Sequence, residues 1–292
     1  IELGSTKDNN KALFCLKQGG RVDHLTLNNE SILADLPATM YHEHYASAIL
    51  FPFANRVKNG IYEFNNNRYQ LYCNEINKQN AIHGLVYNKN FDITTTELNE
   101  HHGIISLHYK YRGLEDGSPF KFHIQLTYIL KKTSLELQVT IHNIGQQAFP
   151  FTIGWHPYFI SSNLSNSYLE FKGLKKVGAN ESARSNSENA SNSIEMINLK
   201  DTILDDAFYS EYQALKFITP NYDLLMKTSS KNNYIQLYTP EVINTIAIEP
   251  MTGVPNSFNN KIGLQTLNPS KSYTICWTIS VQSKNNHQPP IK

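Results

Sequence analysis

Two neighbouring segments of the chain alternate strictly between apolar and polar residues, and this pattern restricts the fold more than any other. The apolar members are Phe120, Phe122, Ile124, Leu126 and Tyr128 in the first segment and Leu135, Leu137, Val139 and Ile141 in the second. A period of two places alternate side chains on one face of an extended strand. Because only a Lys131-Lys132-Thr133 turn separates the segments, they predict an antiparallel pair of long strands with one face in solvent.

Shorter segments of the same kind recur along most of the chain. They are residues 13–16 and 22–27 around Gly19-Gly20, residues 61–64 and 68–72 around three asparagines, and residues 103–111, 234–238, 245–249 and 272–281. No long amphipathic helix interrupts them. We therefore expect an all-β fold of large stacked antiparallel sheets with few short helices, in a single domain over residues 1–292.

The ends of this domain and one internal stretch have a different composition. Residues 11–283 are expected to form the ordered core, and residues 285–292 a disordered tail. Residues 178–193 are rich in Ser, Asn and Glu, and we interpret them as a polar surface loop, because strands of the same style resume after them.

Charge and cysteine content exclude several classes of partner. The 26 basic and 25 acidic residues give a net charge of +1, so nothing indicates nucleic acid or a membrane surface as partner, and no apolar run approaches a membrane span. Cys15, Cys73 and Cys276 are far apart, which favours buried free thiols and a cytoplasmic location. The chain starts at Ile1, so a removed leader stays open. We expect a small-molecule partner and a monomer or homodimer.

The stretch FTIGWHPYF at residues 151–159 carries the strongest chemical signal. Pro157 favours an extended backbone at His156, which directs His156 and Trp155 to opposite sides. Gly154 leaves room for a close approach to the main chain. A titratable ring beside aromatic side chains suits a sugar site. The alternative is a packed core strand whose histidine bonds a neighbour.

Four more polar residues have a functional and a structural interpretation each. Glu249 follows a strand and precedes a proline; it lies either at the mouth of a concave sheet or in solvent. Arg56 is either a fixed donor to sugar hydroxyls or a surface side chain lying on Phe53. His83, before a glycine, marks either a ligand approach or a turn. Asp205 either accepts sugar hydroxyls or caps a turn.

These residues, in this order and spacing, resemble the aldose 1-epimerase (galactose mutarotase-like) family from about Leu13 to Val281. The elements that carry the resemblance are Asn55-Arg56, Ala81-Ile82-His83-Gly84, Trp155-His156-Pro157-Tyr158-Phe159, Asp205 and Glu249. The resemblance implies a β-supersandwich with the sugar site in a cleft on one large sheet.

The resemblance also implies roles. His156 falls on the position of the general acid and Glu249 on that of the general base. Arg56, His83 and Asp205 fall on positions that hold sugar hydroxyls, and Trp155, Tyr158 and Phe159 would line or support the pocket. Asp206 is adjacent to Asp205, and the order Asp-x-x-Phe favours Asp205.

The implied reaction interconverts the α and β anomers of a free aldohexose, with no metal or cofactor. In our hypothesis Glu249, as carboxylate, takes the proton of the C1 hydroxyl while protonated His156 gives one to the ring oxygen. The ring opens, C1–C2 rotates, and reclosure reverses both roles. The histidines at 42, 44, 101 and 102 have no third ligand at metal-site spacing and are interpreted as surface residues.

Three alternatives stay open. A hexose-6-phosphate 1-epimerase of the same superfamily would need a second cation near Arg56, for which Lys58 and Arg68 are candidates. A non-catalytic carbohydrate-binding protein would not need both His156 and Glu249. A glycoside hydrolase would usually need two carboxylates. The sequence does not name the sugar.

Overall fold

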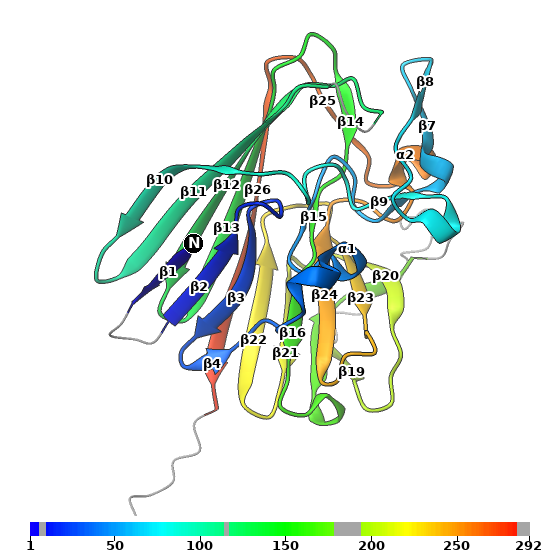
Figure 1. The fold of residues 1–292 in the computed structure, drawn as a ribbon. Helices are drawn as coiled ribbons and strands as arrows, with labels where there is room; N and C mark the ends of the chain where they lie inside the picture. Colours follow the sequence, from blue (N-terminus) through cyan, green and yellow to red (C-terminus); the bar gives the residue numbers. More distant parts are fainter. Residues whose placement is uncertain (6–9, 114–116, 178–193, 285–292) are drawn as a thin grey trace, which may run out of the picture.

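A computed structural model describes residues 1–5, 10–113, 117–177 and 194–284 (Figure 1). Strands dominate these residues and the helices are few and short, which confirms the all-β prediction. The expected polar loop at residues 178–193 and the tail at residues 285–292 lie outside the described residues.

The largest sheet has nine strands and contains the two strongly alternating segments. Its order is β10 (Asp92–Leu98), β11 (His102–Tyr111), β12 (Phe122–Lys131), β13 (Ser134–Asn143), β26 (Ser272–Ser283), β22 (Tyr222–Thr228), β21 (Ala214–Ile218), β17 (Tyr168–Lys172) and β19 (Ile194–Asn198). β12 and β13 pair antiparallel from Phe122 opposite Asn143 to Lys131 opposite Ser134. The predicted hairpin is therefore confirmed, and its alternate residues are buried.

A seven-stranded sheet carries the most chemically interesting residues. It is formed by β18 (Leu174–Lys176), β20 (Asp205–Ser210), β23 (Tyr234–Tyr238), β24 (Thr245–Met251), β15 (Gly154–Trp155) and β5 (Ile49–Leu50), with β16 (Tyr158–Ile160) also paired to β24. β24 is buried along its whole length. Glu249 thus lies within a central strand, which corrects the expectation of a carboxylate at a strand end.

Four smaller sheets complete the fold. They are the four-stranded sheet β1 (Glu2–Ser5), β2 (Asn10–Cys15), β3 (Arg21–Leu27) and β4 (Glu30–Ser31), and the pairs β14 (Phe149–Phe151) with β25 (Gln265–Leu267), β6 (Arg56–Val57) with β9 (Ala81–Ile82), and β7 (Ile61–Phe64) with β8 (Asn67–Gln70). The predicted hairpins β2–β3 and β7–β8 are confirmed.

One apolar core joins the three larger sheets. It includes Phe14 of β2, Leu126 of β12 and Ile248 of β24. Figure 1 shows the four-stranded sheet against β11–β13, while the seven-stranded sheet faces the other end of the nine-stranded sheet. There Trp155 of β15 stacks on Trp277 of β26 with ring centroids 6.4 Å apart.

Helices and cysteines add little to this frame. The short helical segments are η1 (Ala38–Met40), α1 (Tyr41–His44), η2 (Lys58–Gly60), η3 (Ile76–Lys78), η4 (Leu164–Asn166) and α2 (Ser257–Asn260). None of the helices in the described residues is long and apolar enough to span a bilayer.

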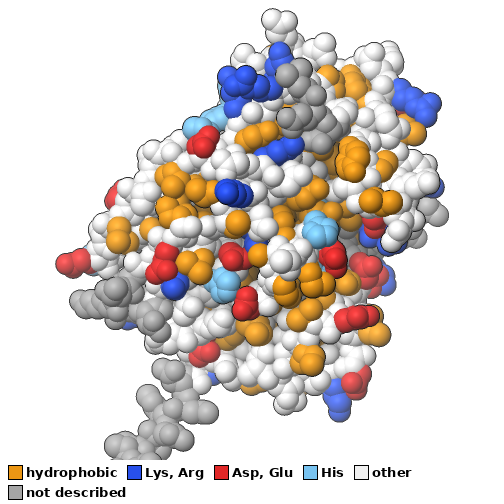
Figure 2. All heavy atoms as spheres, viewed as in Figure 1, with side chains coloured by type: hydrophobic (Ala, Val, Ile, Leu, Met, Phe, Trp, Pro, Cys, Tyr) orange, Lys and Arg blue, Asp and Glu red, His pale blue; other side chains and the backbone are white. Residues whose placement is uncertain are grey.

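The three cysteines are free but only partly buried, which corrects the expectation of buried thiols. The face in Figure 2 mixes acidic, basic and apolar side chains without a continuous basic band.

Candidate active site

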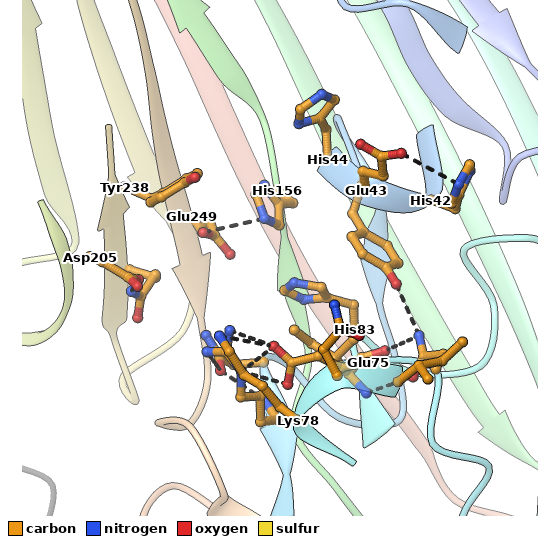
Figure 3. Close-up of a pocket in the computed structure, with 18 of the residues that line it drawn as sticks. His42, Glu43, His44, Glu75, Lys78, His83, His156, Asp205, Tyr238 and Glu249 are labelled. Atoms are coloured by element: carbon orange, nitrogen blue, oxygen red, sulfur yellow. Dashed lines mark hydrogen bonds and ion pairs between the residues drawn. The ribbon is translucent and has the colours of Figure 1, made fainter. Parts of the chain in front are cut away.

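A cavity of about 680 Å³ opens on one face of the seven-stranded sheet. Strands β20, β23 and β24 form one wall, and residues 42–45 of the α1 segment and residues 74–78 around η3 form the rim (Figure 3). This volume lies within the usual range for small-molecule sites. Most of the residues singled out in the sequence line it: Arg56, His83, His156, Tyr158, Asp205 and Glu249.

His156 and Glu249 face each other inside this cavity. His156 follows β15, where its N–H donates to the carbonyl of Ala48 (3.1 Å) and its own carbonyl accepts from Ser47 (2.8 Å). Its Nε2 lies 3.4 Å from Oε1 of Glu249, and Tyr158 stacks on its ring at 5.0 Å. The side chains are only 6% and 3% exposed, so a titratable pair is held almost out of water.

Burial favours the uncharged form of both side chains, His156 and Glu249. It lowers the pKa of His156 to about 3 and raises the pKa of Glu249 well above its ordinary value, with Asp205 adding to the rise and Arg56 opposing it. Loss of solvent disfavours the charged form of each group. In the free protein burial therefore favours a neutral His156 and a protonated Glu249, whereas the reaction expected from the sequence starts from the opposite form.

His83 approaches the pair from β9. Its backbone has a φ of +63°, and its ring lies 5.0 Å from that of His156 and 4.7 Å from that of Tyr45. The next residue, Gly84, has a φ of +80°, and a Cβ there would lie 2.3 Å from the carbonyl oxygen of Phe51. The His-Gly dipeptide thus combines both interpretations: it is a tight turn, and it directs a histidine into the cavity.

Arg56 begins β6 and is held by a carboxylate. Its Nε donates to both oxygens of Glu75 (3.0 and 2.9 Å) and its Nη2 donates to Oε1 (2.9 Å). Nη1 makes one long bond to Oδ1 of Asn55 (3.4 Å). The hydrogen bonds that Arg56 donates to Glu75 raise the pKa of Arg56. The side chain is therefore a fixed donor with one end toward the cavity.

Asp205 and Asp206 separate because successive residues of a strand point to opposite sides. Asp205 lines the cavity and accepts a hydrogen bond from Nε2 of Gln236 on β23 (2.9 Å). Asp206 pairs with Lys176 (2.7 Å) and does not line the cavity. The geometry agrees with the choice of Asp205.

Trp155, Phe159 and Gly154 differ from what the sequence predicted for them. Trp155 and Phe159 are fully buried in the core and do not line the cavity. Trp155 contacts Trp277 because the extended backbone turns it away from His156, so the expectation that it contacts the sugar is corrected. The space beside Gly154 is filled by Met251 and Ala54, 3.0 and 3.2 Å from where a Cβ would lie, and not by an open approach.

Other cavity residues gave no usable signal in the sequence. They include His42, Glu43, His44, Tyr45, Asn74, Glu75, Lys78, Gln236 and Tyr238. His42 and Glu43 are exposed, as expected for surface residues, but they belong to the cavity rim. Lys58 and Arg68, the expected second cations, do not line the cavity, whereas Lys78 does.

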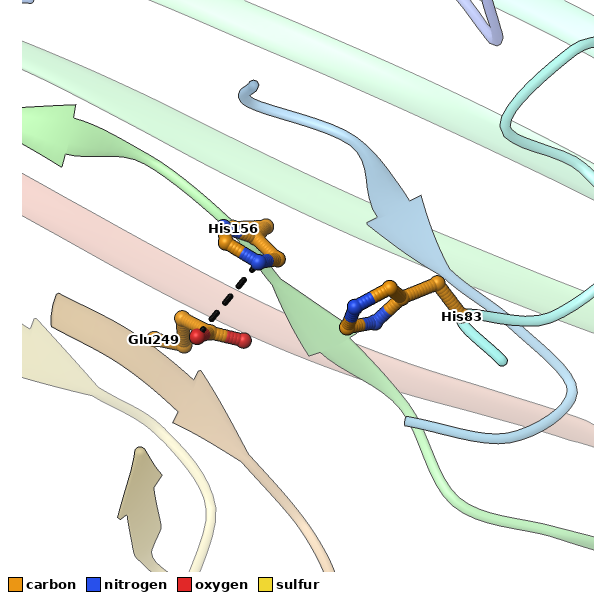
Figure 4. A group of neighbouring side chains, drawn as sticks. All are labelled: His83, His156 and Glu249. Atoms are coloured by element: carbon orange, nitrogen blue, oxygen red, sulfur yellow. Dashed lines mark ion pairs between the residues drawn. The ribbon is translucent and has the colours of Figure 1, made fainter. Parts of the chain in front are cut away.

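Three ligand-type atoms converge at the deepest point. One donor atom each of His83, His156 and Glu249 lies within 4.8 Å of the others, and within the described residues this is the single such group (Figure 4). Two histidines and a glutamate also form zinc sites in other proteins. Among the described residues, His83 Nδ1, His156 Nδ1 and Glu249 Oε2 are buried atoms without a hydrogen-bond partner, so the group has unused hydrogen-bonding capacity.

Comparison with known proteins identifies the family. A family model described as aldose 1-epimerase matches residues 5–280. The chain belongs to the aldose 1-epimerase family. Among curated proteins, uncharacterized protein YihR of Escherichia coli (strain K12) is 28% identical over 249 residues, which are 81% of this chain and 79% of YihR.

Solved structures of similar proteins show the same fold. The Slr1438 protein of Synechocystis sp. PCC 6803 superposes with a TM-score of 0.79 at 20% identity, covering 97% of this chain and 96% of that one. A galactose mutarotase-like protein of Clostridium acetobutylicum gives 0.77 at 18% identity, covering 94% and 93%. Galactose 1-epimerase of Lactobacillus acidophilus NCFM gives 0.74 at 15% identity, covering 96% and 93%. The predicted galactose mutarotase-like fold is confirmed.

Proposed function

We propose that this member of the aldose 1-epimerase family interconverts the α and β anomers of a free aldohexose. The observation that carries the proposal is the pair His156–Glu249, 3.4 Å apart and buried at the base of the cavity. Around the pair lie Arg56, His83 and Asp205, which supply donors and acceptors for sugar hydroxyls.

The reaction needs one acid and one base that can exchange roles. Glu249 takes the proton from the C1 hydroxyl as His156 gives a proton to the ring oxygen, and the C1–O5 bond breaks to give the aldehyde. After rotation about C1–C2, His156 takes the proton back from the C5 hydroxyl and Glu249 returns its proton to the new C1 oxygen. Such positioned proton transfers contribute about 10²–10⁴-fold each.

The free protein stores one proton on this pair, and the reaction uses that proton. With the proton on Glu249 and His156 neutral, the pair has the same total charge as the carboxylate–imidazolium form. Sugar hydroxyls that donate to Glu249 stabilise the carboxylate and so favour transfer of the proton to His156. The site then reaches its ring-opening form without exchange of protons with bulk water.

Charge in the cavity favours an uncharged sugar over a phosphorylated one. Glu75 already occupies Nε and Nη2 of Arg56, so the fork that would grip a phosphate is engaged. Asp205 adds a further acidic group to the same cavity. Lys78 also lines the cavity, and it too contacts Glu75 (3.4 Å). We therefore rank hexose-6-phosphate below a free aldohexose.

The test is polarimetry on freshly dissolved α-D-glucose and α-D-galactose. We expect the wild-type protein to accelerate the change in rotation with at least one sugar. We expect Glu249→Gln to lose about 10²–10⁴-fold of that acceleration, because one proton transfer is removed, while calorimetry still detects sugar binding. Equal acceleration by both proteins would show that Glu249 is not the base.

A wild-type protein that is inactive on both sugars but active on glucose-6-phosphate would establish the phosphorylated alternative. Sugar binding without turnover of any of the three substrates would establish the binding-protein alternative.

A further inference from the structure

We propose that Glu75 is the positioning residue of the sugar site: it fixes Arg56 and, by engaging the guanidinium fork, makes the site select uncharged sugars. This inference rests on the proposed function and names a residue that neither the sequence analysis nor the family model assigns. Glu75 precedes η3 at the rim of the cavity, and its side chain is 16% exposed.

The contact between Glu75 and Arg56 has the geometry of a fixed pair. Three N–H···O bonds of 2.9–3.0 Å join them, and bidentate arginine–carboxylate pairs restrict orientation more than single bonds do. Because Nε and Nη2 both point at Glu75, the Nη1 end is the part of Arg56 that stays available. Its long bond to Asn55 (3.4 Å) is readily exchanged for a sugar hydroxyl.

Glu75 is itself held in place by its own turn. Asn80 donates from Nδ2 to Oε2 of Glu75 (2.8 Å), and the backbones of the two residues bond in both directions (3.0 and 3.3 Å). Although burial raises it, the hydrogen bonds from Arg56 and Asn80 hold the pKa of Glu75 below its ordinary value. The carboxylate is thus a rigid, charged support for Arg56 and not a mobile rim group.

The neighbouring Asn74 strengthens this interpretation, because it supports His83 in the same way. Its side chain accepts from the N–H of Ile82 (2.8 Å) and donates to the carbonyl of Ile82 (3.0 Å), directly before His83. Adjacent residues of one turn therefore fix the two sugar-binding side chains that enter from β6 and β9. We expect the turn at residues 74–80 to set the geometry of the sugar, while His156 and Glu249 perform the proton transfers.

The charge of Glu75 also has a predicted effect on specificity. A free guanidinium fork binds phosphate well, but here the fork is neutralised. Removing the charge in Glu75→Gln leaves Arg56 as an unpaired cation beside the cavity. We expect this variant to bind inorganic phosphate at least about 5-fold more tightly than the wild type, a gain that a merely structural role of Glu75 would not produce.

The experiment is a double-mutant cycle on Arg56 and Glu75, with kcat/KM for mutarotation as one readout and competition by inorganic phosphate as the other. We expect Glu75→Gln to lower kcat/KM about 10- to 100-fold, since small misplacements of binding groups have effects of this size. In the Arg56→Ala background the same change should cost less than about 3-fold, because coupled residues are not additive. Fully additive losses would overturn the proposal.

Two variants serve as controls. Glu63→Gln makes the same charge change at an exposed position on β7 that does not line the cavity, and we expect it to alter neither readout. Glu75→Asp keeps the charge but shortens the side chain, so we expect it to lower kcat/KM without the gain in phosphate affinity. If Glu75→Gln does not fold, Glu75→Asp replaces it in the double-mutant cycle with Arg56→Ala, where fully additive losses in kcat/KM would again overturn the proposal.

The phosphate readout separates this proposal from the proposed function. If the wild type accelerates mutarotation of no sugar, the proposed function fails, but calorimetry with inorganic phosphate still tests Glu75. Tighter phosphate binding by Glu75→Gln that disappears in Arg56→Ala/Glu75→Gln would support the role of Glu75 in engaging Arg56. Unchanged phosphate affinity in Glu75→Gln would overturn it.

Discussion

The shared environment of His156 and Glu249 shifts the pKa values of both side chains. Both are nearly out of contact with water, and the same burial lowers the pKa of the histidine and raises that of the glutamate. The pair therefore carries one proton over a wide pH range, and its apparent pKa values belong to the pair as a whole. The proposed reaction uses this singly protonated state.

The pH dependence of kcat/KM should follow from that state. We expect no loss from pH 7 down to pH 5, since the lower pKa of the pair is about 3, and a decline on the alkaline side as Glu249 loses its proton. Asp205 helps to raise the pKa of Glu249, so Asp205→Asn should move the alkaline limb to lower pH, in addition to weakening sugar binding.

Asp206→Asn is the matched control, because Asp206 pairs with Lys176 outside the cavity. This variant should leave the alkaline decline of kcat/KM at the same pH. A kcat/KM that rises with pH through about 6.5 would contradict the assignment, because it would indicate a histidine with an ordinary pKa.

At the scale of elements, the turn after β9 is the most constrained segment of the site. His83 and Gly84 both have positive φ, and Gly84 lies against the backbone of Phe51 without room for a Cβ. The ring of His83 reaches His156 only because the chain turns so sharply at this point. Backbone strain of this kind concentrates where side chains must be placed accurately.

Gly84→Ala should therefore destabilise the protein and disturb the site together. We expect a loss of at least roughly 1–3 kcal/mol from the positive φ alone, with a further cost from the clash at 2.3 Å, and a reduced kcat/KM. Gly145→Ala is the matched control, since a Cβ there meets its nearest atom at 3.3 Å and no positive φ is involved. Denaturant unfolding and polarimetry measure both effects, and equal stability losses would contradict the argument.

The success of the sequence predictions depended on the length of the element. β12 and β13 have ten residues each, enough for their period of two to be unmistakable. η3 and α1 have three and four residues and show no period, so the rim of the cavity was not predicted. The contact of Arg56 with Glu75 spans 19 positions and arises from the pairing of β6 with β9, which two-residue strands do not reveal in a sequence.

At the scale of the whole molecule, the buried site should affect how the free energy of unfolding changes at acid pH. Burial lowers the pKa of His83 and His156 below the ordinary value of 6.5, so both are neutral when folded and gain a proton on unfolding as the pH falls below 6.5. Stability contributed by each is present above 6.5 and is lost as the pH falls toward the folded pKa. Glu249 acts in the opposite direction, because burial raises its pKa, and the stability that it contributes increases as the pH falls.

Between pH 7 and pH 5 we expect a loss of roughly 2 kcal/mol from His83, because the loss from His156 is offset by the gain from Glu249. Urea unfolding of the wild type at both pH values measures the slope. The variant His83→Gln should have a shallower dependence over the same interval, whatever its stability at pH 7. The exposed His42 provides the control, and His42→Gln should leave the slope unchanged.

The division of the site between strands and turns has a consequence for how such proteins diversify. The proposed proton-transfer groups belong to β24 and to the segment between β15 and β16, whereas the rim comes from residues 42–45 and 74–78. Exchanging these two rim segments between relatives would alter substrate preference and leave the reaction itself intact. A new substrate range on this scaffold therefore requires grafting of only these nine residues, and the sheets beneath them can be kept unchanged.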